Sequence, residues 1–387
     1  MTRGPLNRAL SGFTSTIFAE MSALAARTSS VNLGQGFPDF DGPTAMLERA
    51  RQAIADGVNQ YPPGAGDPGL RAAVAAHQRR FYDIELDRDS EVLVTAGATE
   101  GIAAAMLSLL EPGDEVVLLE PYYDSYAATI ALAGAVRRPV RIEPPDFALP
   151  RETLAAAINP ATRLLLLNSP HNPTGAVLSE ADLAFIADLA VRHDLLVVTD
   201  EVYEHLTYDG VRHLPLSTLP GMAERTVTLS SAGKTFSATG WKIGWATGPS
   251  DLVAAVRAAK QFLTYVNGAP FQPAIAEALQ LPDSYFEGFR TSLQDKRDRL
   301  IDGLNAAGIA TFRPSGTYFV VSDARSLGFE DGLELCRALP ERCRVVAVPM
   351  QVFYDNPDGA RHLVRFAYCK RDEVLDEAVR RLRTLRP

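Results

Sequence analysis

The chain is poor in several features that mark specialised classes of protein. Only three of its 387 residues are cysteines, and none of them form a C-x-x-C pair. This pattern argues against a disulfide framework or a thiolate metal site, and it fits a reducing cytoplasm. No apolar run approaches the ~18 residues that suggest a membrane span. The first residues lack a compact apolar stretch before a cleavage site, so we expect no secretory leader.

An excess of positive charge is also missing. The 38 lysines and arginines are outnumbered by 47 aspartates and glutamates, which leaves a net charge of −9 without a basic block. We therefore expect neither a nucleic acid nor an anionic membrane surface as a partner. A hydrophobic content of 47% is ordinary for a globular protein, and the length predicts two sub-domains.

A third absence concerns the stretch "SSAGKT" (230–235), which follows the apolar run "TVTL" and looks like the end of a nucleotide-binding loop. The P-loop pattern needs a glycine five residues before Gly233, and Thr228 stands there. Lys234 therefore needs another role. The glycines of "GAGDPG" (64–69) follow "NQYPP" rather than a buried strand, so they predict a loop and not a dinucleotide site.

What the chain does contain is an alternation of short apolar runs and helical patterns. The runs are apolar throughout, as in strands buried on both faces of a parallel sheet: "EVLVTAG" (91–97), "DEVVLLE" (114–120), "RLLLLNSP" (163–170) and "LLVVTDE" (195–201). They predict an α/β sandwich with helices on both faces. After about residue 275 the pattern changes to a smaller α+β domain.

Polar and aromatic clusters follow the predicted strands. They are "TAGATEG", "EPYYDSY", "NSPHNPTG", "TDEVY" and "SSAGKT". Ligands of open α/β sheets lie beyond the carboxyl ends of the strands, so these clusters should meet in one crevice.

Two of these clusters suggest where a phosphate and a charged ring would lie. Ala98 and Thr99 follow Gly97 at a predicted helix start, which suits a phosphate, and Ser231 and Lys242 would add a hydroxyl and a charge. Asp200 ends the apolar run "LLVVTD", and a buried carboxylate is costly without a cation.

The cation facing Asp200 is predicted to be organic. No His-x-x-His or Asp-x-Asp cluster stands nearby, and His205 and His213 read as ordinary loop histidines, so we expect no metal. A protonated ring nitrogen is the better partner, with Tyr123 as an aromatic face and Asn172 and Tyr203 as hydrogen-bonding groups. The amine of Lys234 would then form a Schiff base with a carbonyl cofactor.

This set of residues resembles the fold-type I, class I/II aminotransferases, which use pyridoxal 5′-phosphate (PLP). The likeness is greatest to the kynurenine/glutamine/methionine branch and extends to actinobacterial N-succinyldiaminopimelate aminotransferases. It rests on seven motifs in the order of the family: "NLGQGFPDF" (32–40), "NQYPPG" (59–64), "EPYYDSY", "NSPHNPTG", "TDEVYEHL", "SSAGKTFSATGWKIGW" and "HLVRFAYCKRDE" (362–373). The resemblance implies a large PLP-binding domain (41–275) with a mostly parallel seven-stranded sheet in an α/β/α sandwich. It also implies a small α+β domain (276–387) joined by an N-terminal arm (1–40).

The resemblance also implies a role for each matching residue. Three residues would be catalytic. Lys234 would be the Schiff-base lysine and proton carrier, and Asp200 would be the partner of the ring nitrogen. Tyr203 would donate to the ring oxygen. The remaining cofactor contacts would be Ala98, Thr99, Tyr123, Asn172, Ser231, Lys242, and Tyr61 from the second subunit of a homodimer. The substrate would meet Gly36, Phe18, Asn172 and Arg365, the last through a guanidinium–carboxylate pair.

The implied activity is transfer of an α-amino group to a 2-oxo acid such as 2-oxoglutarate (EC 2.6.1 type). The aromatic candidates Phe18, Tyr61, Tyr123 and Phe353 favour a neutral, aromatic, sulfur-containing or long side chain on the donor. Two enzymatic alternatives remain open: an N-succinyldiaminopimelate aminotransferase of lysine biosynthesis, and a PLP-dependent β-eliminating C–S lyase. A ligand-sensing domain of a transcription regulator is disfavoured, because the acidic chain has no room for a DNA-binding extension before "NLGQG".

Overall fold

The computed structural model describes residues 6–13 and 17–385, and its centre is a seven-stranded sheet. The sheet has the order β2-β8-β7-β6-β5-β3-β4, and only β8 runs antiparallel to its neighbours. This arrangement confirms the predicted fold. The strands span Val92–Thr95 (β2), Gly244–Thr247 (β8), Thr226–Ser231 (β7), Leu196–Asp200 (β6), Thr162–Asn168 (β5), Glu115–Glu120 (β3) and Val136–Arg141 (β4).

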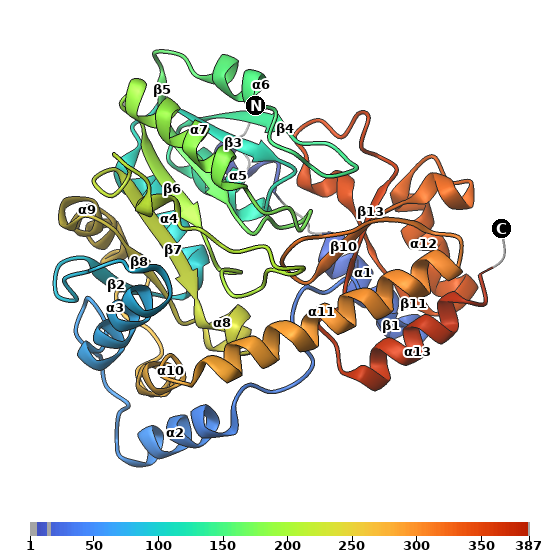
Figure 1. The fold of residues 1–387 in the computed structure, drawn as a ribbon, viewed down its shortest axis with the longest axis horizontal. Coiled ribbons are helices and arrows are strands. Elements are labelled where there is room, and N and C mark those ends of the chain that lie inside the picture. Colours follow the sequence, from blue (N-terminus) through green and yellow to red (C-terminus); the bar gives the residue numbers. More distant parts are fainter. Residues whose placement is uncertain (1–5, 14–16, 386–387) are drawn as a thin grey trace.

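Continuous apolar runs form the middle of this sheet because helices cover both of its faces (Figure 1). In β3, Val116 and Leu118 belong to one core cluster, whereas Val117 and Leu119 belong to another. The first core is completed by α4 (Gly97–Leu109), α5 (Asp124–Leu132) and α9 (Ser250–Lys260), and the second by α6 (Arg151–Ala157) and α7 (Glu180–Arg192).

A third core lies at the β2 edge of the sheet. There α2 (Thr44–Ala55), α3 (Pro68–Tyr82) and α10 (Gln272–Ala278) pack together. The boundary expected at residue 275 falls inside α10, which packs on α2 and α3. The long helix α11 (Asp283–Ala306) begins in this third core at Phe286 and continues into the second domain, where Leu293 and Leu300 are buried (Figure 1).

The second domain is built on a four-stranded antiparallel sheet in the order β12-β13-β10-β9. These strands are Val348–Pro349, Leu363–Ala367, Phe319–Asp323 and Ala310–Phe312, and the helices α12 (Gly332–Cys343) and α13 (Asp372–Leu382) accompany them. The N-terminal segment is part of this domain, because α1 (Ile17–Thr28) packs on α12 and β1 (Val31–Asn32) pairs with β11 (Val345–Val346).

Short helical segments complete the chain. They are η1 (Arg8–Leu10), η2 (Leu216–Thr218), α8 (Ala232–Thr235), η3 (Thr239–Trp241), η4 (Ala324–Leu327) and η5 (Met350–Phe353). Among the helices of residues 6–13 and 17–385, none has the length and apolar character needed to span a bilayer.

Candidate active site

A cavity of about 270 Å³ lies at the carboxyl ends of the central strands, facing the second domain. The predicted site residues come together there, with the exception of Tyr61. The cavity is lined by Phe18, Gly36, Ala98, Thr99, Tyr123, Asn172, Asp200, Tyr203, Ser231, Lys234, Lys242 and Arg365, together with Phe353. The wall is contributed by both domains and by the N-terminal segment, so the site forms only when these parts are assembled.

Lys234 lies on α8, the one-turn helix that follows β7. Its amine donates a hydrogen bond to the hydroxyl of Tyr318 at 3.0 Å. Burial lowers the pKa of Lys234 to about 8, against the opposing effects of Cys369 and Asp200. An amine with this pKa is partly unprotonated near neutral pH, which makes it a competent nucleophile toward a carbonyl group.

Asp200 is the last residue of β6, and its carboxylate is buried. It accepts hydrogen bonds from the hydroxyl of Tyr126 at 2.7 Å and from the backbone N–H of Val202 at 3.3 Å. Within the described chain, no lysine, arginine or histidine forms an ion pair with it. Burial raises the pKa of Asp200 to about 6. A protonated ring nitrogen beside this carboxylate would supply the missing positive charge.

The amino end of α4 forms an anion-binding corner. Gly97 has a φ of +69°, and a Cβ at this position would lie 3.2 Å from the Nζ atom of Lys242. Lys242 in turn donates to the hydroxyl of Thr99 at 3.3 Å. This corner suits a phosphate group, because it combines the free backbone N–H groups at the start of a 13-residue helix with a lysine and with the buried Ser231 at the end of β7.

Arg365 lies opposite this corner, on β13 of the second domain, and is only 2% exposed. Its guanidinium donates to the side-chain oxygen of Asn172 at 2.9 Å and lies 3.9 Å from the centre of the Phe319 ring. The Nε–H group is buried without a partner. Burial lowers the pKa of Arg365 to about 10, which leaves it charged at neutral pH. An incoming carboxylate would give this buried cation its counter-ion.

Tyr203 and Asn172 lie between these two ends of the cavity. Tyr203 is buried, and its ring is perpendicular to that of Tyr318 at 5.2 Å. The backbone N–H of Asn172 donates to the side-chain oxygen of Asn168 at 2.7 Å, which fixes the turn after β5. Tyr123 lies at the start of α5 and presents its ring to the cavity.

Sequence reasoning missed several residues at the site, among them Tyr126, Asn168 and Tyr318. Tyr126 stands three residues after Tyr123 in "EPYYDSY", and this helical spacing puts both tyrosines on one face, so the signal was present. Asn168 likewise ends the run "LLLLN". Tyr318 had no such signal, because it approaches Lys234 only when the second domain packs against the first.

Tyr61 lies outside the cavity, in the loop between α2 and α3, and its side chain is 81% exposed. Its ring contacts that of Tyr265 at 5.5 Å, edge to face. Tyr61 is therefore not among the residues of its own chain that line the cavity.

The cavity therefore offers an amine, a buried carboxylate and an anion-binding corner around one space, with an arginine at its far side. The orphaned Nε of Arg365 and the unpaired Asp200 are the groups that an occupant must satisfy. A flat aromatic aldehyde carrying a ring nitrogen and a phosphate matches the first three features, and an amino acid carboxylate matches the fourth.

Comparison with known proteins gives matches along both domains. The model of the family "aminotransferase class I and II" matches residues 28–382. The chain is 56% identical over 383 residues to the probable N-succinyldiaminopimelate aminotransferase of Mycobacterium tuberculosis, covering 96% of each. It is 38% identical over 387 residues to methionine aminotransferase of Escherichia coli, covering 100% of each. The solved structure of N-succinyldiaminopimelate aminotransferase from M. tuberculosis has a TM-score of 0.96 at 57% identity, over 98% of this chain and 100% of that one.

Proposed function

Because the chain belongs to the class I and II aminotransferases and is thus a PLP-dependent aminotransferase, we propose that its amino donor has a long side chain. N-Succinyldiaminopimelate is the first donor we propose, with a 2-oxo acid such as 2-oxoglutarate as acceptor. The name of the M. tuberculosis relative, at 56% identity, points to this compound.

The observation that carries the proposal is a second hollow next to the cavity. It measures about 490 Å³ and shares Phe18 and Phe353 with the cavity wall. Its described lining residues include one cation, Arg137, and two carboxylates, Asp124 and Asp355. Asp355 accepts two hydrogen bonds from the Arg137 guanidinium, at 2.9 and 3.1 Å, so a substrate carboxylate would have to take its place. A donor anchored at Arg365 could extend its side chain past the two phenylalanines, and Arg137 would then meet a distal carboxylate.

We assign the chemical roles as follows. PLP, when bound, supplies an electron-accepting ring. Lys234 would hold the cofactor as a Schiff base and then move the proton that leaves the substrate Cα. Asp200 would keep the ring nitrogen protonated, and Tyr126 holds that carboxylate in place. Tyr203 would donate to the ring oxygen.

The remaining assignments concern binding. Asn172 and the ring of Tyr123 would orient the cofactor, while the phosphate would lie at Ala98, Thr99, Ser231 and Lys242. Arg365 would bind the substrate carboxylate near the backbone of Gly36, with Phe18 against the donor side chain. Water is kept from this region by the aromatic rings packed on Arg365, which include Phe319 at 3.9 Å and Phe353 at 4.8 Å.

We further propose a homodimer in which Tyr61 completes the phosphate site of the partner subunit. An exposed apolar patch around Tyr61 supports this proposal, because Phe262 is 88% exposed and Leu263 and Tyr265 are exposed beside it. Such a patch on one chain is typical of an association surface. The proposed location is the cytoplasm, since all three cysteines are buried and free.

A donor panel tests the substrate. The holoenzyme is mixed with N-succinyldiaminopimelate, methionine, kynurenine, glutamine or aspartate, and conversion of bound PLP to its amine form is followed by absorbance. We expect kcat/KM for N-succinyldiaminopimelate to exceed that for methionine at least tenfold, and Arg137→Met to remove most of this advantage. A preference for methionine that survives Arg137→Met would instead support the second candidate, a methionine aminotransferase, which the phenylalanine-rich wall favours. Pyruvate and ammonia from cystathionine would reveal C–S lyase activity.

A further inference from the structure

A cluster of two histidines and a glutamate lies outside the cofactor cavity. His77 comes from α3, whereas Glu204 and His205 follow β6. One potential ligand atom from each side chain lies within 4.8 Å of those of the other two. The Nε2 atoms of His77 and His205 are 2.8 Å apart and so point into the same space. The sequence spacing concealed this cluster, because 128 residues separate the two histidines.

The glutamate of this cluster has no cationic partner. Glu204 is 4% exposed, and its Oε1 atom accepts a hydrogen bond from the hydroxyl of Ser230 at 2.6 Å. In residues 6–13 and 17–385, no lysine or arginine forms an ion pair with it. The neighbouring Glu201 differs, because His213 donates to it at 2.7 Å. A buried carboxylate without a counter-charge is expensive unless it is protonated or coordinates a cation.

The two imidazoles face each other through the ring nitrogens that would bind the metal. One of these Nε2 atoms carries the proton of the hydrogen bond between the rings, so a cation can bind both nitrogens only when that ring moves its proton to Nδ1. The Glu204 carboxylate accepts hydrogen bonds from both Ser230 and Tyr82, so the cation would take the place of one of these partners.

We propose that His77, Glu204 and His205 bind one divalent metal ion of the zinc type. Two imidazoles and one carboxylate suit zinc at roughly 2.0–2.2 Å, with a fourth position left for water. Ligand nitrogens around a tetrahedral zinc lie about 3.3 Å apart, so the two rings must separate by about half an ångström from their present contact. His205 is partly accessible to solvent, which gives the ion a path of entry.

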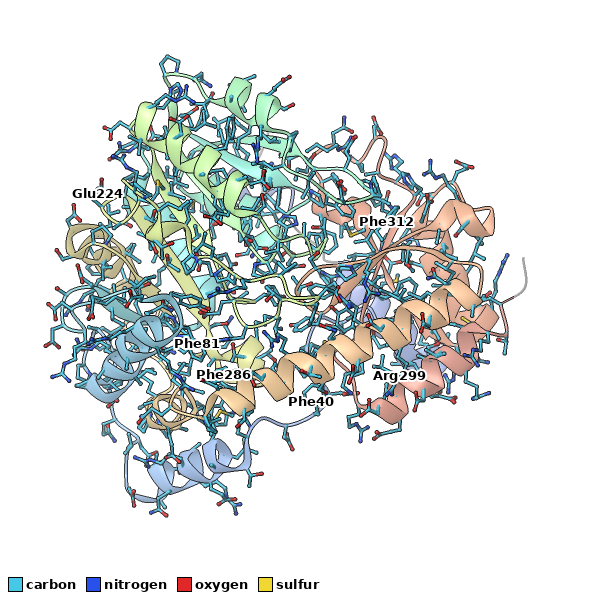
Figure 2. All side chains as sticks on the ribbon, in the orientation of Figure 1. Phe40, Phe81, Glu224, Phe286, Arg299 and Phe312 are labelled. Atoms are coloured by element: carbon cyan, nitrogen blue, oxygen red, sulfur yellow. The ribbon has the colours of Figure 1, made fainter. Side chains whose placement is uncertain are left out.

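Aromatic rings hold both histidines in place. Phe81 lies 4.8 Å from the ring of His77 and 4.7 Å from that of His205, and Phe286 lies 4.5 Å from His205. Figure 2 shows Phe81 and Phe286 next to each other, where the start of α11 meets α3.

The bound ion would tie α3 to the segment that follows β6. This segment begins at Glu201, directly after Asp200, and carries Tyr203 immediately before Glu204. The metal would therefore be structural, and it would stabilise the loop behind the cofactor cavity without touching the reacting atoms.

The test is metal binding by the holoenzyme. The protein is dialysed against a chelator and then titrated with Zn²⁺, and the metal content is measured after gel filtration. Co²⁺ serves as a second probe, because a nitrogen-ligated four-coordinate site gives visible absorption beyond that of PLP. We expect one equivalent of tightly bound metal per chain and a higher Tm in the presence of Zn²⁺.

The variants His77→Gln and His205→Gln should each weaken Zn²⁺ binding at least 100-fold and abolish the Tm increase. His193→Gln, at an exposed histidine after α7, is the matched control and should behave as wild type. The PLP absorbance of each variant reports whether it is folded. Wild-type protein that retains no metal after the titration would overturn the proposal. Binding that is unchanged in both His77 and His205 variants would do the same, since the ion would then lie elsewhere.

Discussion

The amine of Lys234 donates to the hydroxyl of Tyr318 at 3.0 Å, and this hydroxyl donates to the carbonyl oxygen of Gly36 at 2.6 Å. The three residues come from α8, from the second domain immediately before β10, and from the N-terminal segment. The lysine is therefore held by a contact that depends on the packing of all three parts. Tyr318 is fully buried, so no water can replace its hydroxyl without rearrangement.

Replacing Tyr318 by Phe should lower kcat about 10- to 100-fold and leave the KM for the donor nearly unchanged, because a hydrogen bond to a charged group contributes about 1.5–3 kcal/mol. The loss of an acceptor also disfavours the protonated amine. The pH midpoint for recapture of PLP by the apoenzyme should therefore shift down by about one unit. Both quantities are obtained from steady-state kinetics and from absorbance after PLP addition.

Tyr368→Phe is the matched control for this variant. Tyr368 is also buried, but its hydroxyl donates to the backbone oxygen of Thr317 at 3.2 Å and not to the lysine. Its substitution should leave the pH midpoint in place. If both variants shift the midpoint equally, Tyr318 acts only through packing.

Asp200 gives the cofactor-free enzyme a characteristic dependence on pH. Burial raises its folded-state pKa from 3.8 to about 6, so the folded state binds a proton that the unfolded state releases between these values. The free energy of unfolding should therefore fall by about 3 kcal/mol as the pH rises from about 3 to about 7, relative to Asp200→Asn. Urea unfolding of both apoproteins at several pH values measures this difference.

Binding of PLP should remove this loss of stability at higher pH, because the protonated ring nitrogen gives the Asp200 carboxylate a partner. In the holoenzymes the wild type should gain stability over Asp200→Asn at pH 7, and kcat of the variant should fall about 100-fold or more. Equal pH slopes for the two apoproteins would show that Asp200 titrates normally.

Arg365 should control the binding of every amino acid and oxo acid. Arg365→Lys keeps a positive charge but loses the planar pair of donors, so KM should rise about 10- to 100-fold for donor and acceptor alike. Arg361→Lys, at an exposed arginine paired with Asp358, should leave both values unchanged. An effect on only one of the two substrates would mean that Arg365 contacts a side chain and not the common carboxylate.

The fold could be predicted from the sequence because its strongest signals are local. An apolar run such as that of β5 is complete within a few residues. The same holds for the capping box of α7, in which the side chains of Ser179 and Asp182 each accept a hydrogen bond from the other's backbone N–H. The residues that line the cavity could be predicted because they lie in short clusters directly after the strands. Contacts between distant segments could not be predicted from the sequence, because each depends on how separate elements pack. Examples are the contact of Tyr318 with Lys234 and that of His77 with His205.

Lys234→Ala should abolish transamination and covalent attachment of PLP. Borohydride reduction of the wild-type holoenzyme, followed by peptide mass spectrometry, should place the cofactor on the peptide that contains Lys234. The variant should still bind some PLP noncovalently at the α4 corner. Attachment at Lys242 in the wild type would exchange the roles that we assign to the two lysines.

Mixed dimers can test whether Tyr61 contributes to the cofactor site of its own chain or to that of the partner subunit. Tyr61→Ala alone should weaken PLP binding about 10- to 100-fold, as expected for loss of one hydrogen bond to a charged phosphate. Tyr61→Ala and Lys234→Ala subunits are then unfolded together, mixed in equal amounts and refolded with limiting PLP. If Tyr61 serves the partner's site, each mixed dimer has one site with both residues intact, so about a quarter of all sites regain wild-type affinity and activity. If Tyr61 serves its own chain, every site in the mixture lacks one residue, and no activity returns above that of the separate variants.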